Sequence, residues 1–103
     1  METFKVVIEP SAEEDLIEIL SYITYTLKEP VIAKRIFSSI REKVMSLEHM
    51  PCRYAIIDEE PYASMGVRKI LVENYIAFYF VDNKKTVHVF RILYNRRDWK
   101  NLI

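Results

Sequence analysis

Apolar residues recur every three or four positions in the first half of the chain, which is the spacing of one face of an α-helix. Residues 4–8 precede this stripe, and their aromatic and β-branched side chains predict a short strand that Pro10 ends. The stripe itself consists of Leu16, Ile19, Leu20, Ile23 and Leu27. Ser11 and Glu14 have the spacing of a capping box, so we expect the first helix to be capped at Ser11.

A second stripe begins after Pro30, a residue that suits the first turn of a helix because its missing N–H would be unpaired there. Its members are Ala33, Ile36, Phe37, Ile40, Val44 and Leu47. The gap between the two stripes is short, so the helices are expected to form an antiparallel hairpin. Such a hairpin needs a further layer to cover its apolar face.

In the second half the pattern changes to three apolar segments, residues 67–73, 75–82 and 86–94, which turn residues separate. This arrangement predicts an antiparallel meander, and the middle segment should be central because it is apolar on both faces. Residues 50–65 carry two prolines and an acidic run, which predicts a connecting loop. The predicted fold is α+β with the order βααβββ, an N-terminal strand and a helical hairpin packed on an antiparallel sheet, in a single domain of residues 1–103.

The last predicted strand carries an arginine in an apolar row. Alternation places Val87, Val89, Arg91 and Leu93 on one face, and His88, Phe90, Ile92 and Tyr94 on the other. Because a guanidinium keeps its charge, Arg91 needs either a buried carboxylate partner or an open groove that accepts an anion. The sequence leaves both possibilities open.

The C-terminal residues mix cations with aromatic rings, a combination that suits phosphates and stacked bases. They are Tyr94, Arg96, Arg97, Trp99 and Lys100. The alternative is a solvated terminus in which Trp99 is a packing anchor. Residues 1–60 carry 12 acidic and 7 basic side chains, whereas residues 61–103 carry 3 and 8. A net charge of zero with a basic C-terminal half indicates a local site for a polyanion or an acidic protein.

Other kinds of chemistry have little support in the composition. Cys52 is the single cysteine, which excludes an intrachain disulfide and fits a reducing, cytoplasmic compartment. The N-terminus does not resemble a signal peptide, and the longest apolar run, residues 75–81, is too short to span a bilayer, so no membrane partner is expected. Two histidines and one cysteine give no metal-ligand spacing, and one glycine excludes a phosphate-binding loop, so neither metal nor cofactor is expected.

The element order and the closing segment, Phe90-Arg-Ile-Leu-Tyr-Asn-Arg-Arg-Asp-Trp99, resemble the RelE/ParE superfamily of toxins from bacterial type II toxin–antitoxin modules. The resemblance covers essentially the whole chain, including residues 8–12, the acidic start of the first helix and the strand that contains Arg68. The closing motif is closer to ParE. The resemblance implies a small cytoplasmic growth inhibitor, of the plasmid-stabilisation type, which a cognate antitoxin holds silent in a hetero-oligomer.

Two activities occur in that superfamily. ParE-like members act on DNA gyrase and are not nucleases. For this activity the expected target-binding residues are Arg91, Tyr94, Arg96, Arg97, Trp99 and Lys100. RelE-like members cleave messenger RNA on the ribosome without a metal, and the candidate catalytic residues are then Arg68, Arg91 and Tyr94. We favour inhibition of gyrase and leave open whether the protein is an enzyme, because Tyr94, with a phenol pKa of about 10, would be a poor base.

A third interpretation is a non-toxic interaction module, in which Arg68 and Arg91 pair with carboxylates for stability. The candidate partners are Glu73, Asp82 and Asp98. His49 and His88 are expected to have structural roles. Four tyrosines either add to an antitoxin-binding surface or cover the protein's own core. They are Tyr22, Tyr25, Tyr54 and Tyr62.

Overall fold

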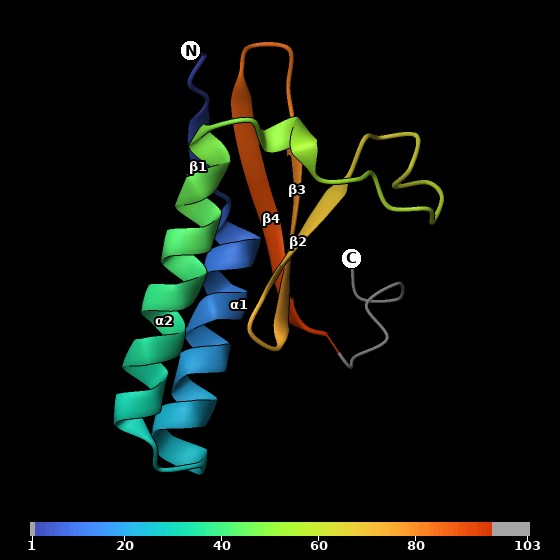
Figure 1. Cartoon of the computed structure of the whole chain (residues 1–103). Coiled ribbons are helices and arrows are strands. Elements are labelled where there is room, and N and C mark those ends of the chain that lie inside the picture. The colour runs from blue at the N-terminus through green and yellow to red at the C-terminus, as the bar shows by residue number, and fades with distance from the viewer. Residues whose placement is uncertain (1, 96–103) are drawn as a thin grey trace.

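The computed structural model describes residues 2–95, which form a strand, two helices and three further strands (Figure 1). The elements are β1 (Lys5–Ile8), α1 (Pro10–Ser21), a π-helical turn (Tyr22–Thr26), α2 (Pro30–Met45), β2 (Arg68–Val72), β3 (Tyr75–Val81) and β4 (Thr86–Tyr94). Two short 3-10 turns, Ser46–Glu48 and Pro51–Arg53, follow α2. The predicted α+β order βααβββ is confirmed.

The described strands form one sheet in the order β1-β4-β3-β2. As predicted, β2, β3 and β4 form an antiparallel meander, and β3 lies inside the sheet. β1 lies beside β4 and runs parallel to it, with Ile8 opposite Val89, so the sheet is mixed where a wholly antiparallel one was expected. A parallel neighbour needs a long crossover connection, and the helical hairpin is part of that connection.

The helical hairpin covers one face of the sheet, and the main core lies between the two layers (Figure 1). This core includes Ala12, Leu16, Ile36, Ile40 and Val44 from the helices and Ile70, Ala77, Tyr79, Val87, Val89 and Ile92 from the sheet. Each large aliphatic side chain that is fully buried contributes roughly 1.5–3 kcal/mol. Two members of the predicted stripes remain outside this core, because Leu27 is 50% exposed and Phe37 is 40% exposed.

A second apolar cluster lies on the opposite face of the sheet. Its buried members are Ile57, Val67, Ile76, Phe78 and Leu93. The segment between α2 and β2 supplies Ile57 and Tyr62 to this cluster, and the N–H of Ile57 donates to the carbonyl of Val67 at 2.9 Å. The predicted loop of residues 50–65 therefore covers the second face of the sheet (Figure 1), which explains why β3 is apolar on both faces.

Candidate functional site

The candidate site begins where β4 continues past the end of β1 at Ile8. Backbone groups of β4 beyond this point lack a neighbouring strand on that side, and unpaired groups shielded from water are costly. The first turns of α1 supply their partners. Ser11 donates a hydrogen bond from Oγ to the carbonyl of Phe90 at 2.6 Å, and Asp15 accepts one from the N–H of Ile92 at 3.0 Å. Side chains of α1 thus take the place of a longer β1.

The prediction of a capping box at Ser11 was wrong. The N-cap of α1 is Glu9, Pro10 occupies the first turn, and the cap makes no side-chain hydrogen bond. Proline at this position starts a helix without a capping side chain, because it has no N–H to satisfy. The Ser11 hydroxyl is therefore available for its long-range bond to β4.

A β-bulge interrupts the alternation of β4. Phe78 on β3 lies opposite Arg91, whereas its neighbour Tyr79 lies opposite Val89. Phe90 is therefore an extra residue on β4. An extra residue shifts every later side chain by one position relative to a simple period of two.

The prediction that Val87, Val89, Arg91 and Leu93 share one face was wrong beyond the bulge. Val87 and Val89 join the main core together with Ile92, whereas Leu93 joins the second cluster. Arg91 therefore does not interrupt the apolar row that faces the helices. It lies at the bulge, where it reaches α1.

Arg91 is held by a carboxylate at two points. Its Nε lies 2.7 Å from Oδ2 of Asp15, and its Nη2 lies 3.0 Å from Oδ1. The side chain of Asp15 is 11% exposed and that of Arg91 is 26% exposed. The hydrogen bond with Asp15 raises the pKa of Arg91 above its usual range. Of the two possibilities that the sequence left open for Arg91, the structure contains the carboxylate partner.

This partner is not one of the carboxylates proposed from the sequence. Glu73 pairs with Arg35 at 2.9 Å, and Asp82 pairs with His88 at 2.8 Å. The remaining candidate, Asp98, lies outside the described residues. Asp15 was interpreted only as a charge at the start of the helix, although it directly precedes Leu16 of the apolar stripe.

Arg68 lies at the start of β2 and holds the loop that follows α2. It donates hydrogen bonds to the carbonyl of Cys52 at 3.2 Å and to the carbonyl of Tyr54. Opposite Arg68, Tyr79 donates its hydroxyl to the carbonyl of Pro51 at 2.6 Å. Burial raises the pKa of Tyr79 far above its usual range, so the phenol keeps its proton for this bond. These contacts fix the loop against the sheet.

Arg68 and Tyr94 lie at opposite ends of the sheet. Tyr94 pairs with Tyr75, and Tyr75 in turn pairs with Val72. Arg68 precedes Val72 by four residues on the same strand, a separation of about 13 Å at roughly 3.3 Å per residue. The structure brings Arg91 and Tyr94 to the same end of β4 and leaves Arg68 apart from them.

A pocket of about 670 Å³ lies beside Tyr94. Tyr22, Tyr75 and Tyr94 line it together with Glu18. The rings of Tyr75 and Tyr94 meet edge to face with their centroids 5.7 Å apart. Burial raises the pKa of Tyr75, and the nearby Tyr94 adds to this increase. Glu18 and Tyr75 were not predicted as site residues, because it is strand pairing and the packing of α1 that bring them to Tyr94.

His88 connects the β3–β4 turn with the start of α1. Its Nε2 lies 2.8 Å from Oδ2 of Asp82, its Nδ1 lies 3.4 Å from Oε2 of Glu9, and its ring stacks on Phe80 with centroids 4.9 Å apart. The hydrogen bond with Asp82 raises the pKa of His88, and Glu9 adds to this effect although partial burial opposes it. The pKa of Asp82 is lowered by the same bond. These contacts are those of a structural histidine.

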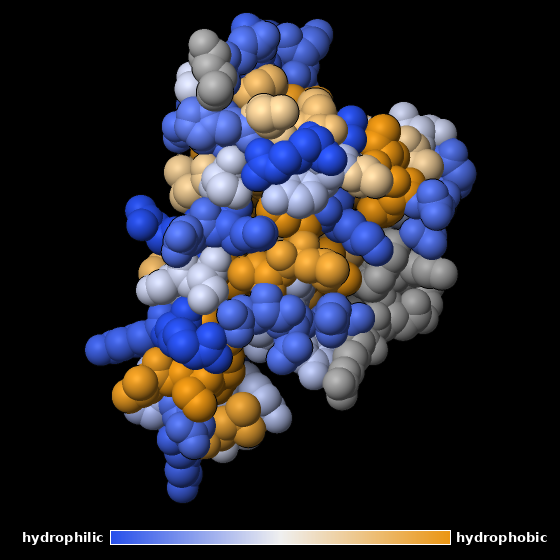
Figure 2. Space-filling view, viewed as in Figure 1, coloured by the Kyte–Doolittle hydropathy of each residue, from blue (hydrophilic) through white to orange (hydrophobic). Residues whose placement is uncertain are grey.

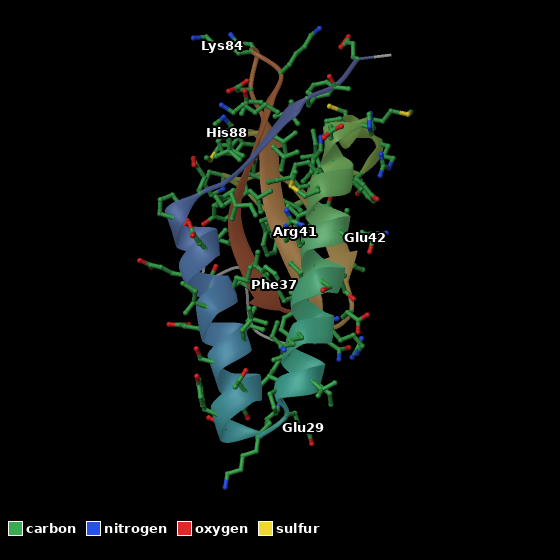
Figure 3. All side chains as sticks on the ribbon, turned by 90° about the vertical axis from the view of Figure 1, so that its left-hand side faces the viewer. Glu29, Phe37, Arg41, Glu42, Lys84 and His88 are labelled. Carbon is green, nitrogen blue, oxygen red and sulfur yellow. The ribbon has the colours of Figure 1, made fainter. Side chains whose placement is uncertain are left out.

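The outer side of the helical hairpin carries an apolar groove of about 350 Å³ between α1 and α2, which we call the hairpin groove. Ile17, Phe37 and Met45 line it and are 59%, 40% and 39% exposed. Glu13 and Arg41 are its charged members, and Figure 3 shows Phe37 and Arg41 on the side of α2 that faces α1. Within residues 2–95 Arg41 has no ion-pair partner. This groove was not predicted from the sequence, because Phe37 belongs to the apolar stripe of α2 and was expected in the core.

Apolar patches also interrupt the polar surface over the helices and reach the free end of the hairpin (Figure 2). At that end Leu27, Val31 and Ile32 are exposed. A small protein rarely leaves so much apolar surface in water without a partner.

Four of the predicted target-binding residues cannot be placed in the site. Arg96, Arg97, Trp99 and Lys100 lie outside the described residues. Among the described residues no helix has the length and apolar character needed to cross a membrane. Residues 2–95 also contain no group of three or more His, Cys, Asp or Glu side chains suited to a metal ion. His49 lies at the surface, 3.3 Å from Glu48.

Known proteins share both the sequence pattern and the fold. A sequence profile of the family described as "ParE toxin of type II toxin-antitoxin system, parDE" matches residues 6–99. No curated protein matches the chain. A solved chain from the chromosomal ParDE TA system of P. aeruginosa is 24% identical with a TM-score of 0.73, over 89% of this chain and 96% of that chain. A chain from the toxin–antitoxin complex RelBE2 of Mycobacterium tuberculosis is 19% identical with a TM-score of 0.64, over 89% of this chain and 98% of that chain.

These solved structures support the fold. Family membership rests on the sequence profile, because the profile matches most of the chain, including the closing motif. The resemblance seen in the sequence is confirmed. The chain belongs to the ParE toxin family of type II toxin–antitoxin systems.

Proposed function

We propose that this ParE-family chain arrests growth in the cytoplasm by inhibiting DNA gyrase through protein contacts, without catalysing a reaction itself. Family membership supports this proposal, and the observation that carries it is the engagement of the candidate catalytic arginines. Asp15 binds Arg91 at two points, and loop carbonyls bind Arg68. Both guanidiniums thus already have partners within the fold.

The alternative, ribosome-dependent cleavage of messenger RNA, requires proton-transfer groups and cations that converge on one phosphate. Among residues 2–95 the candidates do not converge, because Arg68 and Tyr94 lie on β2 and β4 with β3 between them and are also offset along the strands by about 13 Å, at roughly 3.3 Å per residue. In addition, the segment that contains Ile57 and Tyr62 covers the sheet face opposite the helices. This geometry favours a binding protein over a nuclease.

The proposal is tested with one preparation of purified protein in two assays, gyrase supercoiling and cell-free translation. We expect inhibited supercoiling and intact message. Ribosome-dependent cuts in the message would overturn the proposal in favour of the nuclease. A folded protein that is inactive in both assays would instead favour the non-toxic interaction module.

The predicted contact residues in the C-terminal segment offer a sharper version of this test. Replacing Arg96 and Arg97 together by alanine is expected to weaken gyrase inhibition at least about tenfold, since each charge contact in an interface contributes on the order of 1 kcal/mol. The matched control replaces Lys84 and Lys85, which lie in the exposed β3–β4 turn at the opposite end of β4 from Tyr94. Equal losses in the two double variants would show that net charge, and not this segment, decides inhibition.

We further propose that the cognate antitoxin binds in the hairpin groove. Two adjacent antiparallel helices with exposed apolar side chains accept an amphipathic helix, whose anchors recur every three to four residues. Arg41, which has no ion-pair partner within residues 2–95, fits an acidic side chain on that helix. The solved relatives, described as ParDE and RelBE2 systems, support a partner of this kind.

This binding site is tested by calorimetric titration with the antitoxin encoded beside the toxin. Phe37→Asp places a charge in the groove and is expected to weaken binding at least about 100-fold, because a carboxylate would have to be desolvated against apolar side chains. Lys34→Asp adds a carboxylate at an exposed position of α2 outside the groove and should change affinity less than about threefold. Similar affinities for both variants would exclude the groove.

A further inference from the structure

The pocket beside Tyr94, which we call the tyrosine pocket, shares no described lining residue with the hairpin groove. It lies where the π-helical turn meets the paired ends of β3 and β4. Leu27 N–H donates to the carbonyl of Tyr22 at 3.0 Å, a spacing of five residues that defines this turn. Turns of this type are frequent at functional sites. Ile19, Ile23 and Leu27 form the apolar part of the lining.

Among the described residues that line the tyrosine pocket, one side chain is charged. This side chain is the carboxylate of Glu18, and within residues 2–95 it has no ion-pair partner. Glu18 also acts electrostatically on Arg91, but less than Asp15 does. Asp15 already neutralises Arg91 at 2.7 Å. The charge on Glu18 therefore remains for a ligand.

The aromatic part has the chemistry of a cation site. Tyr22, Tyr75 and Tyr94 line a volume of about 670 Å³, within the range of ordinary ligand pockets. Among the described residues their hydroxyls have no hydrogen-bond partner. Ring faces attract cations, and a carboxylate beside them adds to the attraction. Phosphate groups are disfavoured by the same carboxylate.

We propose that the tyrosine pocket binds an arginine or lysine side chain of a protein partner. The apolar stem of such a side chain packs against Ile19 and Ile23, while its charged end meets Glu18 and the rings. A protein is the source that fits, because the apolar residue Leu27, which lines the pocket, is 50% exposed and can be covered by the surface of a protein partner. The proposal rests on the proposed function and deepens it, since Tyr94 is one of the residues expected to contact gyrase and the pocket names the chemistry of that contact.

The test measures binding of two small probes to the purified full chain by NMR of the tyrosine rings. The probes are N-acetyl-arginine amide and N-acetyl-citrulline amide, which have nearly the same shape and differ in charge. We expect saturable shifts at Tyr22, Tyr75 and Tyr94, with the arginine probe binding about fivefold more tightly. Glu18→Gln should remove this preference. Glu14→Gln, an exposed acid of α1 outside the pocket, should retain it.

Three results would overturn the proposal. The first is equal binding of both probes, and the second is a set of shifts outside the pocket. The third is arginine binding that occurs only in a chain ending at Asn95, which would assign the pocket to the chain's own C-terminal segment. The probe titration contains neither gyrase nor antitoxin. Its result and the result of the supercoiling assay are therefore independent, and a failure of one proposal can be distinguished from a failure of the other.

Discussion

Asp15 is a residue whose role in the site cannot be read from the local sequence pattern. Three acids stand in a row at the start of α1, and the sequence gives them equal weight as charges near the positive end of a helix. Asp15 differs by its place on the helix, where it reaches both Arg91 and the N–H of Ile92. Which of three neighbouring carboxylates faces the sheet depends on how α1 packs on β4. Local spacing does not contain that information.

The Asp15–Arg91 pair should therefore matter for stability. Asp15→Asn removes the charge opposite a partly buried guanidinium and is expected to lower the free energy of unfolding by about 1 to 3 kcal/mol. The cost is below that of a fully buried pair because Arg91 is 26% exposed. Urea denaturation measures it, with Glu14→Gln, an exposed acid, expected to change stability by less than about 0.5 kcal/mol. Equal stability of the two variants would contradict a stabilising role for this pair.

His88 should make stability depend on pH in a defined direction. Its pKa is raised above the ordinary value of 6.5, so its contribution is fully present below pH 6.5 and is lost as pH rises through the folded pKa. The pKa of Asp82 is lowered below 3.8, so its contribution is present above that pH and is lost as pH falls through the folded pKa. The pair is therefore most favourable between these two ordinary values.

The variant His88→Gln isolates this effect. It should flatten the decrease in unfolding free energy as pH rises above 6.5, measured by urea denaturation at several pH values. His49→Gln provides the control, because His49 lies at the surface and its removal leaves the contacts of His88 intact. An unchanged pH profile in His88→Gln would show that Asp82 and Glu9 do not favour the imidazolium.

Among the helices and strands, the sequence predicts the features that follow from the local periodicity of apolar residues. It does not predict the features that depend on pairing between distant segments. The helical stripes and the meander follow from spacing alone, since buried faces repeat at 3.6 or 2 residues. The bulge at Phe90 and the parallel β1 depend on contacts between distant segments. For the candidate site, this means that Arg91 and Tyr94 could be named in advance, whereas their partners Asp15 and Tyr75 could not.

The hydrogen bond from Ser11 of α1 to Phe90 of β4 should contribute to stability. Ser11→Ala should lower the free energy of unfolding by about 1 kcal/mol, because it removes the hydrogen bond to Phe90. Helix content by circular dichroism should stay the same, since the N-cap is Glu9. Ser21→Ala, at an exposed position near the other end of α1, should be neutral or slightly stabilising. A loss of helix content in Ser11→Ala would instead support the capping box that was predicted from the sequence.

The two proposed binding regions, the hairpin groove and the tyrosine pocket, have different linings. The hairpin groove lies on the outer side of α1 and α2, whereas Tyr94 ends β4 beside the tyrosine pocket. Both use α1, but their described linings share no residue, because Ile17 and Leu20 line the groove whereas Glu18 and Ile19 line the pocket. An antitoxin in the groove therefore need not cover the residues expected to contact the target, and it would have to extend beyond the groove to silence them.

This separation predicts that neutralisation and toxicity can be uncoupled in cells. Phe37 is 40% exposed and lies outside the main core, so Phe37→Asp should fold, weaken antitoxin binding and leave gyrase inhibition intact. Cells that produce this variant together with the antitoxin should stop growing, whereas cells with Lys34→Asp and the same antitoxin should grow. If Phe37→Asp is folded by circular dichroism but harmless, the groove itself contacts the target, and binding of the antitoxin and of gyrase would then be competitive.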